Sequence, residues 1–493
     1  MTSRIKLTYN CFGFKPFLMC RLFLPGLIFI STFWTIQGQE TWSLAKCIDY
    51  ALENSLDLEQ NRLLVSEAEI DLKQTRLLRI PSLGSSVSYN IAFGRTIDPT
   101  TYDFTDQQFH NQGISLSGGA TVFNGGRVTN TIRQAQLNKE VMELNREQLR
   151  NDISLDVAQR YLAVLFSLEN LENALKNLAL TENQLTEINK FIAAGSRPQN
   201  DRLELVAQVA QNEQAVTAAQ NEIDLSYLSL KHLLHLGPQS EMIIERPDLE
   251  VPFAYDVEAL NVESTYRRAL LLQPKIRAGE VREEFAELDV TLARSTMIPS
   301  LSGGFSLGTN FSSASLRPGD LVGTNLVSTP GVFINNEQVL FEISQPVYDI
   351  KEVSYFNQID ENLRWGIGIN LDIPIFNQGS NKSNLEKAKL NVIRTNVDNL
   401  NEKDQLIREV QTAIADLKAA KKQYEASQKT VEAIQAAFND TGKRFQLGVI
   451  SSFEFTNAQN NLERAEVDLL LSKYDYIFKS KIVDYYQGNE ITL

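Results

Sequence analysis

The chain has 493 residues, of which 43% are hydrophobic and 22% are charged, and its formal net charge is −14 at neutral pH. This acidic balance argues against nucleic-acid binding, because such binding needs a basic surface that neutralises phosphates. The length allows two or three ordinary domains. The composition is that of a globular or coiled-coil protein and not of a bundle of membrane helices.

The N-terminal segment 1–38 predicts a secretory signal peptide. It contains four basic residues and no acidic one, and an apolar run over 22–36 ends shortly before Gly38. This order is typical of a signal that is cut after a small residue. The alternative is a membrane anchor, but Pro25 and Gly26 interrupt the run, which falls short of the ~20 apolar residues of a spanning helix. Cleavage after Gly38 changes the charge to −14 − 4 = −18 and leaves Cys47 as the one cysteine, so no internal disulfide is expected.

Two copies of one unit follow the signal. Residues 80–83 (Ile-Pro-Ser-Leu) recur at 298–301, which is an offset of 298 − 80 = 218. Residues 122–126 (Val-Phe-Asn-Gly-Gly) recur at 375–379 as Ile-Phe-Asn-Gln-Gly, an offset of 375 − 122 = 253. The difference, 253 − 218 = 35, indicates one insertion in the second copy. Self-similarity at constant offsets indicates duplicated structural units.

These offsets divide the chain into four parts. We expect the signal peptide at 1–38, a first repeat at 39–237, a proline-bearing linker at 238–255 and a second repeat at 256–493. Prolines in the linker favour irregular structure there.

Each repeat contains two segments in which apolar residues alternate with small polar ones. They lie at about 83–93 and 113–123 in the first repeat and at about 301–311 and 363–376 in the second. Alternation with period two predicts strands, and about ten residues suffice for a tilted strand to cross a bilayer. An ordinary antiparallel sheet with one buried face is the alternative. Four strands cannot close a membrane barrel, so several chains must share one if the strands span the membrane.

Long helices account for most of the remainder. Proline-free stretches predict helices over about 128–191 and 383–445, and shorter return helices are expected at about 201–234 and 452–486. Apolar residues at alternating spacings of three and four favour coiled-coil packing. A further helix precedes each strand pair and ends near Arg79 or Met297. The expected fold class is therefore α+β, mostly α.

We predict no enzymatic activity, no cofactor and no metal site. His232 and His235 lie close together on a predicted helix, but no acid or cysteine nearby completes a ligand set. The glycine pairs are not followed by the Gly-Lys-Ser of a phosphate-binding loop. We therefore assign no catalytic residue.

The motifs together resemble the TolC-like outer-membrane efflux protein family. The resemblance covers nearly the whole mature chain and is carried by the Ile-Pro-Ser-Leu strand entry, by Phe-Asn-Gly-Gly-Arg at 123–127, and by Arg-Phe-x-x-Gly-x-x-Ser at 444–451. This resemblance implies a homotrimer. Its twelve strands would form a β-barrel in outer-membrane lipid, and its helices would form a long periplasmic α-barrel. The segments 94–111 and 310–362 would then face outside, and the insertion lies in the second. The strand-to-helix turns comprise Phe123, Asn124, Gly125, Gly126, Phe376, Asn377 and Gly379.

The resemblance also places two functional sites at the periplasmic tip. A periplasmic adaptor protein, which links to an inner-membrane pump, is expected to dock at Gly195, Arg444, Leu447, Gly448, Val449 and Ser451. The narrow entrance is expected to be lined by Asp201, Glu204, Glu454 and Asn457. Position 457 departs from the family, where an acid is usual, and this makes the expected ring less negative. Alternatively, Asp201 and Glu454 simply occupy first helical turns, which acids stabilise.

The leading hypothesis is a passive exit duct of the outer membrane that serves a tripartite efflux pump or a type I secretion system. The alternative is a non-conducting structural or adhesive coiled-coil protein of the envelope. A periplasmic enzyme is disfavoured because a catalytic set is missing. The sequence assigns neither the exported substrate nor the class of pump.

Overall fold

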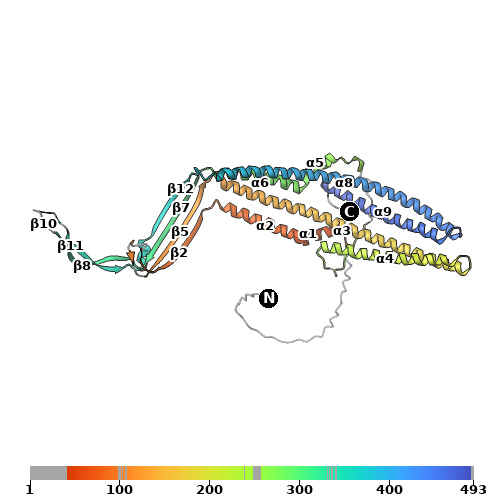
Figure 1. The fold of residues 1–493 in the computed structure, drawn as a ribbon, viewed down its shortest axis with the longest axis horizontal. Coiled ribbons are helices and arrows are strands. Elements are labelled where there is room, and N and C mark those ends of the chain that lie inside the picture. The colour runs from red at the N-terminus through yellow and green to blue at the C-terminus, as the bar shows by residue number, and fades with distance from the viewer. Residues whose placement is uncertain are drawn as a thin grey trace, which may run out of the picture.

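The computed structural model describes residues 41–97, 102, 104–105, 108–237, 239–247, 257–329, 331, 333–334, 337–338 and 341–489. The predicted signal peptide and part of the predicted linker lie outside these residues. The described chain is elongated, with a helical body at one end and strands at the other (Figure 1).

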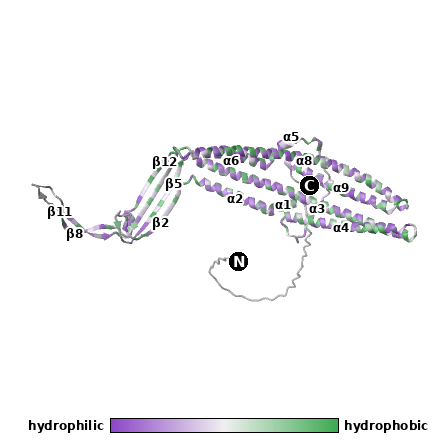
Figure 2. Ribbon diagram, viewed as in Figure 1, coloured by the Kyte–Doolittle hydropathy of each residue, from purple (hydrophilic) through white to green (hydrophobic). Residues whose placement is uncertain are grey.

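Helices of equal length recur along the helical body. Two of 67 residues, α3 (Arg127–Ala193) and α8 (Ser380–Gln446), start at the repeat offset, 380 − 127 = 253, and reach about 100 Å at 1.5 Å per residue. Each is followed by a return helix, α4 (Gln199–Leu233) or α9 (Ser452–Gln487). Figure 2 shows hydrophilic and hydrophobic residues mixed along these helices. Within the described residues, no helix combines the length and the apolar character that a membrane span requires.

The helix that was predicted before each strand pair is split in two. The first repeat has α1 (Leu44–Asn54) and α2 (Leu56–Leu77), and the second has α5 (Val262–Leu272) and α6 (Pro274–Ser295). The split in the first pair occurs at Ser55, whose hydroxyl accepts a hydrogen bond from the Leu58 amide at 3.2 Å and so starts a new helix. In the second pair Pro274 takes the first helical position, where its missing N–H costs nothing. The two pairs have the same lengths, 11 and 22 residues in each.

The strands form an antiparallel sheet in the order β12-β7-β5-β2. Their bounds are Ser82–Ala92 (β2), Phe109–Phe123 (β5), Ser300–Ser312 (β7) and Arg364–Asp372 (β12). The predicted strands are present with shifted ends. β5 starts earlier than expected, and β12 stops before Pro374, which has no N–H to donate to a ladder.

The segment 310–362 was predicted to face outside between two strands, but its regular secondary structure was not predicted. It contains a second antiparallel hairpin of β8 (Leu316–Thr329) and β11 (Phe341–Glu352), followed by the short helix α7 (Tyr355–Glu361). Figure 1 shows the hairpin extending beyond the sheet, away from the helices. Two prolines and two register shifts obscure the period-two pattern in this sequence, which explains why the strands were missed. Further short pairs join β3 (Thr96–Ile97) to β4 (Phe104–Thr105) and β9 (Phe333–Ile334) to β10 (Glu337–Gln338).

A buried glutamine fastens the base of this hairpin to the sheet. The side chain of Gln358 in α7 is 2% exposed. Its Oε1 accepts from the amide of Ser312 at 2.9 Å, and its Nε2 donates to the carbonyls of Ser312 and Val353 at 2.9 and 2.8 Å. Since every polar atom of this amide has a backbone partner, the hairpin base is held firmly against β7.

The described residues of the helical body form two hydrophobic clusters. One joins α1, α3, α4 and α9, and it includes Tyr161 and the free Cys47; the other joins α5, α8 and α9. The linker was predicted to be irregular, but β6 (Ile243–Ile244) within it pairs in parallel with β1 (Thr41–Trp42). The Tyr161 hydroxyl donates to the Glu245 carbonyl at 2.7 Å beside this pair. Burial raises the pKa of the Cys47 thiol to about 12, so the thiol stays protonated.

Candidate functional site: the sheet face and the helical tip

One face of the four-stranded sheet is apolar across all strands. The register sets Val87 opposite Ile114, Leu116 opposite Leu307, and Phe305 opposite Ile367. In the single chain Val87, Phe305 and Ile367 are exposed, at 67%, 42% and 79%, while Ile114, Leu116 and Leu307 are half-buried. An apolar band this broad on a sheet of tilted strands fits a lipid-facing surface.

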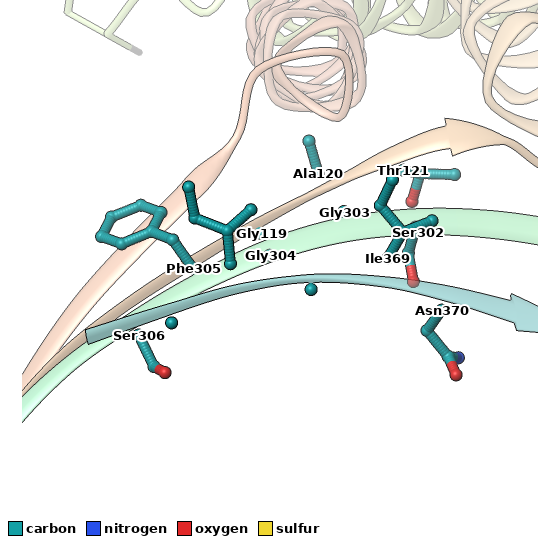
Figure 3. Close-up of a pocket in the computed structure, with 13 residues that line it drawn as sticks. Gly119, Ala120, Thr121, Ser302, Gly303, Gly304, Phe305, Ser306, Ile369 and Asn370 are labelled. Atoms are coloured by element: carbon teal, nitrogen blue, oxygen red, sulfur yellow. The ribbon is translucent and has the colours of Figure 1, made fainter. Parts of the chain in front are cut away.

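Small and polar residues line the other face. A hollow of about 730 Å³ lies on β5, β7 and β12, and residues of both faces border it: glycines and serines together with Phe305, Ile367 and Ile369. In Figure 3, Ser306 and Asn370 point to the side of the sheet opposite to Phe305. This division into an apolar and a hydrated face is what a strand between lipid and a water-filled lumen requires.

The strand-to-helix turns depend on left-handed backbone conformations. Gly125 and Gly126 have φ of 65° and 79°, and in the second repeat Gln378 and Gly379 have 60° and 79°. A Cβ on Gly125 would lie 3.0 Å from the Ile298 side chain, so both φ and space favour glycine there.

The neighbouring turn residues differ in role. The side chains of Asn124 and Asn377 accept hydrogen bonds from the first turns of α3 and α8, each at 3.4 Å. Phe123 and Phe376 are exposed, at 52% and 83%, at the helix-proximal ends of the strands. Exposed aromatic residues at this level are consistent with a membrane-interface girdle.

Both helix-to-helix turns at the far end close with the same glycine geometry. Gly195 and Gly448 have φ of 74° and 78°. The amide of Ser196 donates to the carbonyl of Phe191 at 2.9 Å, and that of Val449 donates to the carbonyl of Arg444 at 3.0 Å. This is the Schellman pattern, in which a left-handed glycine ends a helix and satisfies its last carbonyls.

A clamp that the sequence did not reveal joins the two turns. Arg197 is 13% exposed, and its guanidinium donates to Asp201 at 3.3 Å, to the Ile450 carbonyl at 3.1 Å and to the Phe445 carbonyl. The same group lies 4.9 Å above the Phe445 ring. One side chain of the first turn is therefore bonded to two carbonyls of the second, with a cation–π contact in addition.

The four residues that were predicted at the entrance do not share one environment. Asp201 is buried, at 7% exposure, under the Arg197 clamp, whereas Glu204, Glu454 and Asn457 are exposed. The Ser451 hydroxyl accepts from the Glu454 amide at 3.2 Å, so Glu454 sits in a capped first turn.

The exposed residues that were predicted for docking gather on the second turn. Arg444, Leu447, Gly448, Val449 and Ser451 are all exposed, with Leu447 at 79%. The observed contacts between the two turns are instead made by Arg197, which was not among the predicted residues.

Part-way along the helical body from the tip, a layer of side-chain amides and a hydroxyl connects α3, α4 and α9. Thr181 Oγ1 accepts from Gln459 at 2.7 Å and from Asn212 at 2.8 Å, while Gln208 donates to Asn212 and Asn460, both at 2.9 Å. Buried amides in a coiled coil fix the register of the helices at a cost in stability. In the sequence, such a layer could be recognised by polar residues at positions of the helix seam that are otherwise apolar.

Comparisons with known proteins define the class. The family described as outer membrane efflux protein matches residues 47–234 and 265–480. The chain is 22% identical over 435 residues to the probable outer membrane lipoprotein SilC of Salmonella typhimurium, covering 87% of this chain and 81% of that protein. The CusC crystal structure aligns with a TM-score of 0.72 at 17% identity over 91% and 92% of the two chains. The CmeC outer membrane channel of Campylobacter jejuni aligns at 0.68 and 18% over 90% and 85%.

The chain therefore belongs to the outer membrane efflux protein family. It is an outer-membrane channel protein with a long periplasmic helical extension. The family and the fold are those of channel proteins.

Proposed function

We propose that three copies of this chain form the exit duct of a tripartite efflux pump, through which substrates pass passively to the outside. The carrying observation is the four-stranded sheet, which has an exposed apolar face and unpaired outer edges on β2 and β12. Three such sheets supply 3 × 4 = 12 strands, enough to close a membrane barrel with no free edge. Closed cyclic symmetry is the usual way to satisfy such heterologous edges.

The adaptor docks, in this proposal, on the exposed tip. Leu447, Val449 and Phe453 are 79%, 64% and 61% exposed beside the turn at Gly448, and Gly195 marks the companion turn. Uncovered apolar side chains at the end of a solvated helical body support a protein-docking surface. The inner-membrane pump is then reached through the adaptor, and energy for transport comes from that partner.

The entrance is proposed to be lined by Glu204, Glu454 and Asn457, with three copies of each around the axis. Their exposure at the tip supports this placement. Asp201 acts differently, because its carboxylate holds the Arg197 clamp. With Asn at position 457, the ring carries fewer negative charges than a ring with acids at both 454 and 457. We therefore expect it to attract cations more weakly.

A test combines assembly and conduction. The purified protein is expected to run as a heat-modifiable trimer from the outer-membrane fraction and to give discrete conductance steps in planar bilayers. A trimer without conductance would favour the non-conducting envelope protein. A monomeric periplasmic protein would overturn the proposal altogether. Type I secretion is distinguished from efflux by whether loss of the chain blocks export of a protein or raises sensitivity to small toxic compounds.

A further inference from the structure

Within one chain, the second repeat packs on the first where α6 lies on α3 and β7 pairs with β5. The equivalent surfaces on the outer sides of the chain, on α2 and β2 and on α8 and β12, have no such neighbour among the described residues. Helix α6 packs on both α3 and α8, whereas α2, its counterpart in the first repeat, packs on α3 as its one extensive helix contact in the described chain. Likewise β5 pairs with β2 and β7, while β2 and β12 each pair along one edge. The packing between the repeats is therefore known from inside the chain, while the outer sides of the chain present the same kind of surface without a partner in the described chain.

The open side of α2 carries an apolar stripe at heptad spacing. Its members recur once per heptad and are between 55% and 68% exposed: Leu56, Leu63, Ile70 and Leu77. On α6, the counterparts of the two end positions, Pro274 and Ser295, are buried. A heptad stripe is the seam of a helix that packs on another helix, so this one lacks its partner.

Helix α8 carries a second exposed apolar stripe, with its members at alternating spacings of three and four. Its exposed members are Leu390, Ile393, Val397 and Leu400. Leu390 and Val397 are 64% and 49% exposed, while their counterparts on α3 in the first repeat, Leu137 and Leu144, are 1% and 5% exposed. Those two leucines lie in the part of α3 that α6 covers, between Gln134 and Asn145, which bond to α6.

We propose that α2 and β2 of one copy pack on α8 and β12 of a second copy in the register that α6 and β7 adopt on α3 and β5 within the chain. The inference rests on the proposed trimer and specifies its subunit junction residue by residue. It follows because the equivalent helices α2 and α6, and α3 and α8, have matching bounds and the two hairpins share their register: Ser82 pairs with Gly119 and, at the two offsets, Ser300 pairs with Asp372.

An ion pair follows from this register. Within the chain, Gln134 Nε2 donates to Asp289 Oδ1 at 2.5 Å. Adding 253 to 134 and subtracting 218 from 289 gives Lys387 and Asp71 of the neighbouring copy. Neither side chain has an ion-pair partner among the described residues of one chain. The substitution of an amide donor by an ammonium keeps the donor and adds charge complementarity.

The strand seam follows in the same way. Ser117 lies opposite Ser306, and Gln112 lies opposite Phe311. The offsets place Asn370 opposite Ser88 of the neighbour on the lumen face. They also place Trp365 opposite Phe93 on the apolar face, at the end of the sheet away from the helices. Both pairs preserve the two-faced character of the sheet across the junction.

Cysteine pairs test the strand register. Directly opposed residues of antiparallel strands have Cα atoms about 4.5–5.5 Å apart, within the range of a disulfide. The variant Asn370→Cys with Ser88→Cys is expected to give covalent trimers on oxidation. The matched control, Asn370→Cys with Asn90→Cys, is displaced by one pleat repeat along the strand and is expected to link poorly, since diagonal neighbours are about 7–8 Å apart. Each single variant controls for Cys47.

Charge reversal tests the helix junction. Lys387→Glu is expected to lower the temperature at which the trimer dissociates, and Asp71→Lys in the same chain is expected to restore it. Lys382→Glu is the control, because its α3 counterpart Thr129 is exposed and makes no junction. A conducting trimer in which the control cysteines link as well as the pair, or in which reversal has no effect, overturns the register and leaves the channel intact. Absence of any trimer overturns both.

Discussion

Replacing Arg197 by glutamine removes a side chain that ties the two tip turns together. The side chains of Arg197 and Asp201, taken without their backbone atoms, are 13% and 10% exposed. Breaking a buried pair costs about 3–5 kcal/mol, and a hydrogen bond from a charged donor contributes about 1.5–3 kcal/mol. Because the clamp lies near solvent, the lower value of about 3 kcal/mol applies. This corresponds to a shift of roughly 100-fold toward separated turns, at about 1.4 kcal/mol per factor of ten.

The assay is single-channel recording together with amide hydrogen exchange at the tip. We expect Arg197→Gln to lengthen high-conductance openings and to speed exchange at Val449, whose amide closes the second turn. The neighbouring Arg202 is exposed, so Arg202→Gln removes the same charge without touching the clamp. Asp201→Asn should have a smaller effect than Arg197→Gln, since the carbonyl contacts remain. If Arg197→Gln behaves like Arg202→Gln in both measurements, the clamp does not hold the tip and the reasoning fails.

Four further predictions concern the tip, a half-buried glutamate of α9 and the hairpin. Glu454→Gln should weaken cation block of the conductance, whereas Asn457→Asp should strengthen it; equal block in both would remove the entrance assignment. Gly448→Ala forces an L residue to φ of 78° and should cost about 1–2 kcal/mol in thermal denaturation; an unchanged melting temperature contradicts this. Burial raises the pKa of Glu463, so its ionised form opposes folding: Glu463→Gln should raise the melting temperature at neutral pH, and the gain should vanish as pH falls below the unfolded pKa. Replacing 316–352 by a short turn should preserve assembly and conduction, because the Val353 amide already bonds the Ser315 carbonyl at 3.2 Å; loss of trimer would show that the hairpin is structural.

The elements that could be predicted from sequence are those whose signal is local. Alternation in the four sheet strands and long proline-free stretches each report one periodicity, and the structure has both kinds of element near the expected positions. The glycines at 195 and 448 could be predicted as turns because a left-handed helix end is a local requirement. The hairpin of β8 and β11 was missed because register shifts and Pro346 break its alternation.

The missed site features depend on partners far away in sequence. Arg197 bonds carbonyls 248 and 253 residues further along, and backbone carbonyls leave no residue-type signal. Gln459 bonds Thr181 across 278 residues. Asp201 was grouped with the entrance because a first-turn acid looks the same whether it faces a lumen or a buried arginine. Only the packing of α4 against the second turn separates these cases.

The clamp also breaks the equivalence of the two repeats in a way that bears on opening. The counterpart of Arg197 in the second repeat, at 197 + 253 = 450, is Ile450, which is buried and has no side-chain donor. In the proposed trimer, the junction between turns inside one copy therefore carries an arginine clamp, and the corresponding junction between copies carries none. Three clamped junctions alternate with three unclamped ones. Since a contact worth about 3 kcal/mol favours the closed arrangement only where it exists, separation at the tip should begin between copies, and the two helical hairpins of each copy should move as one body.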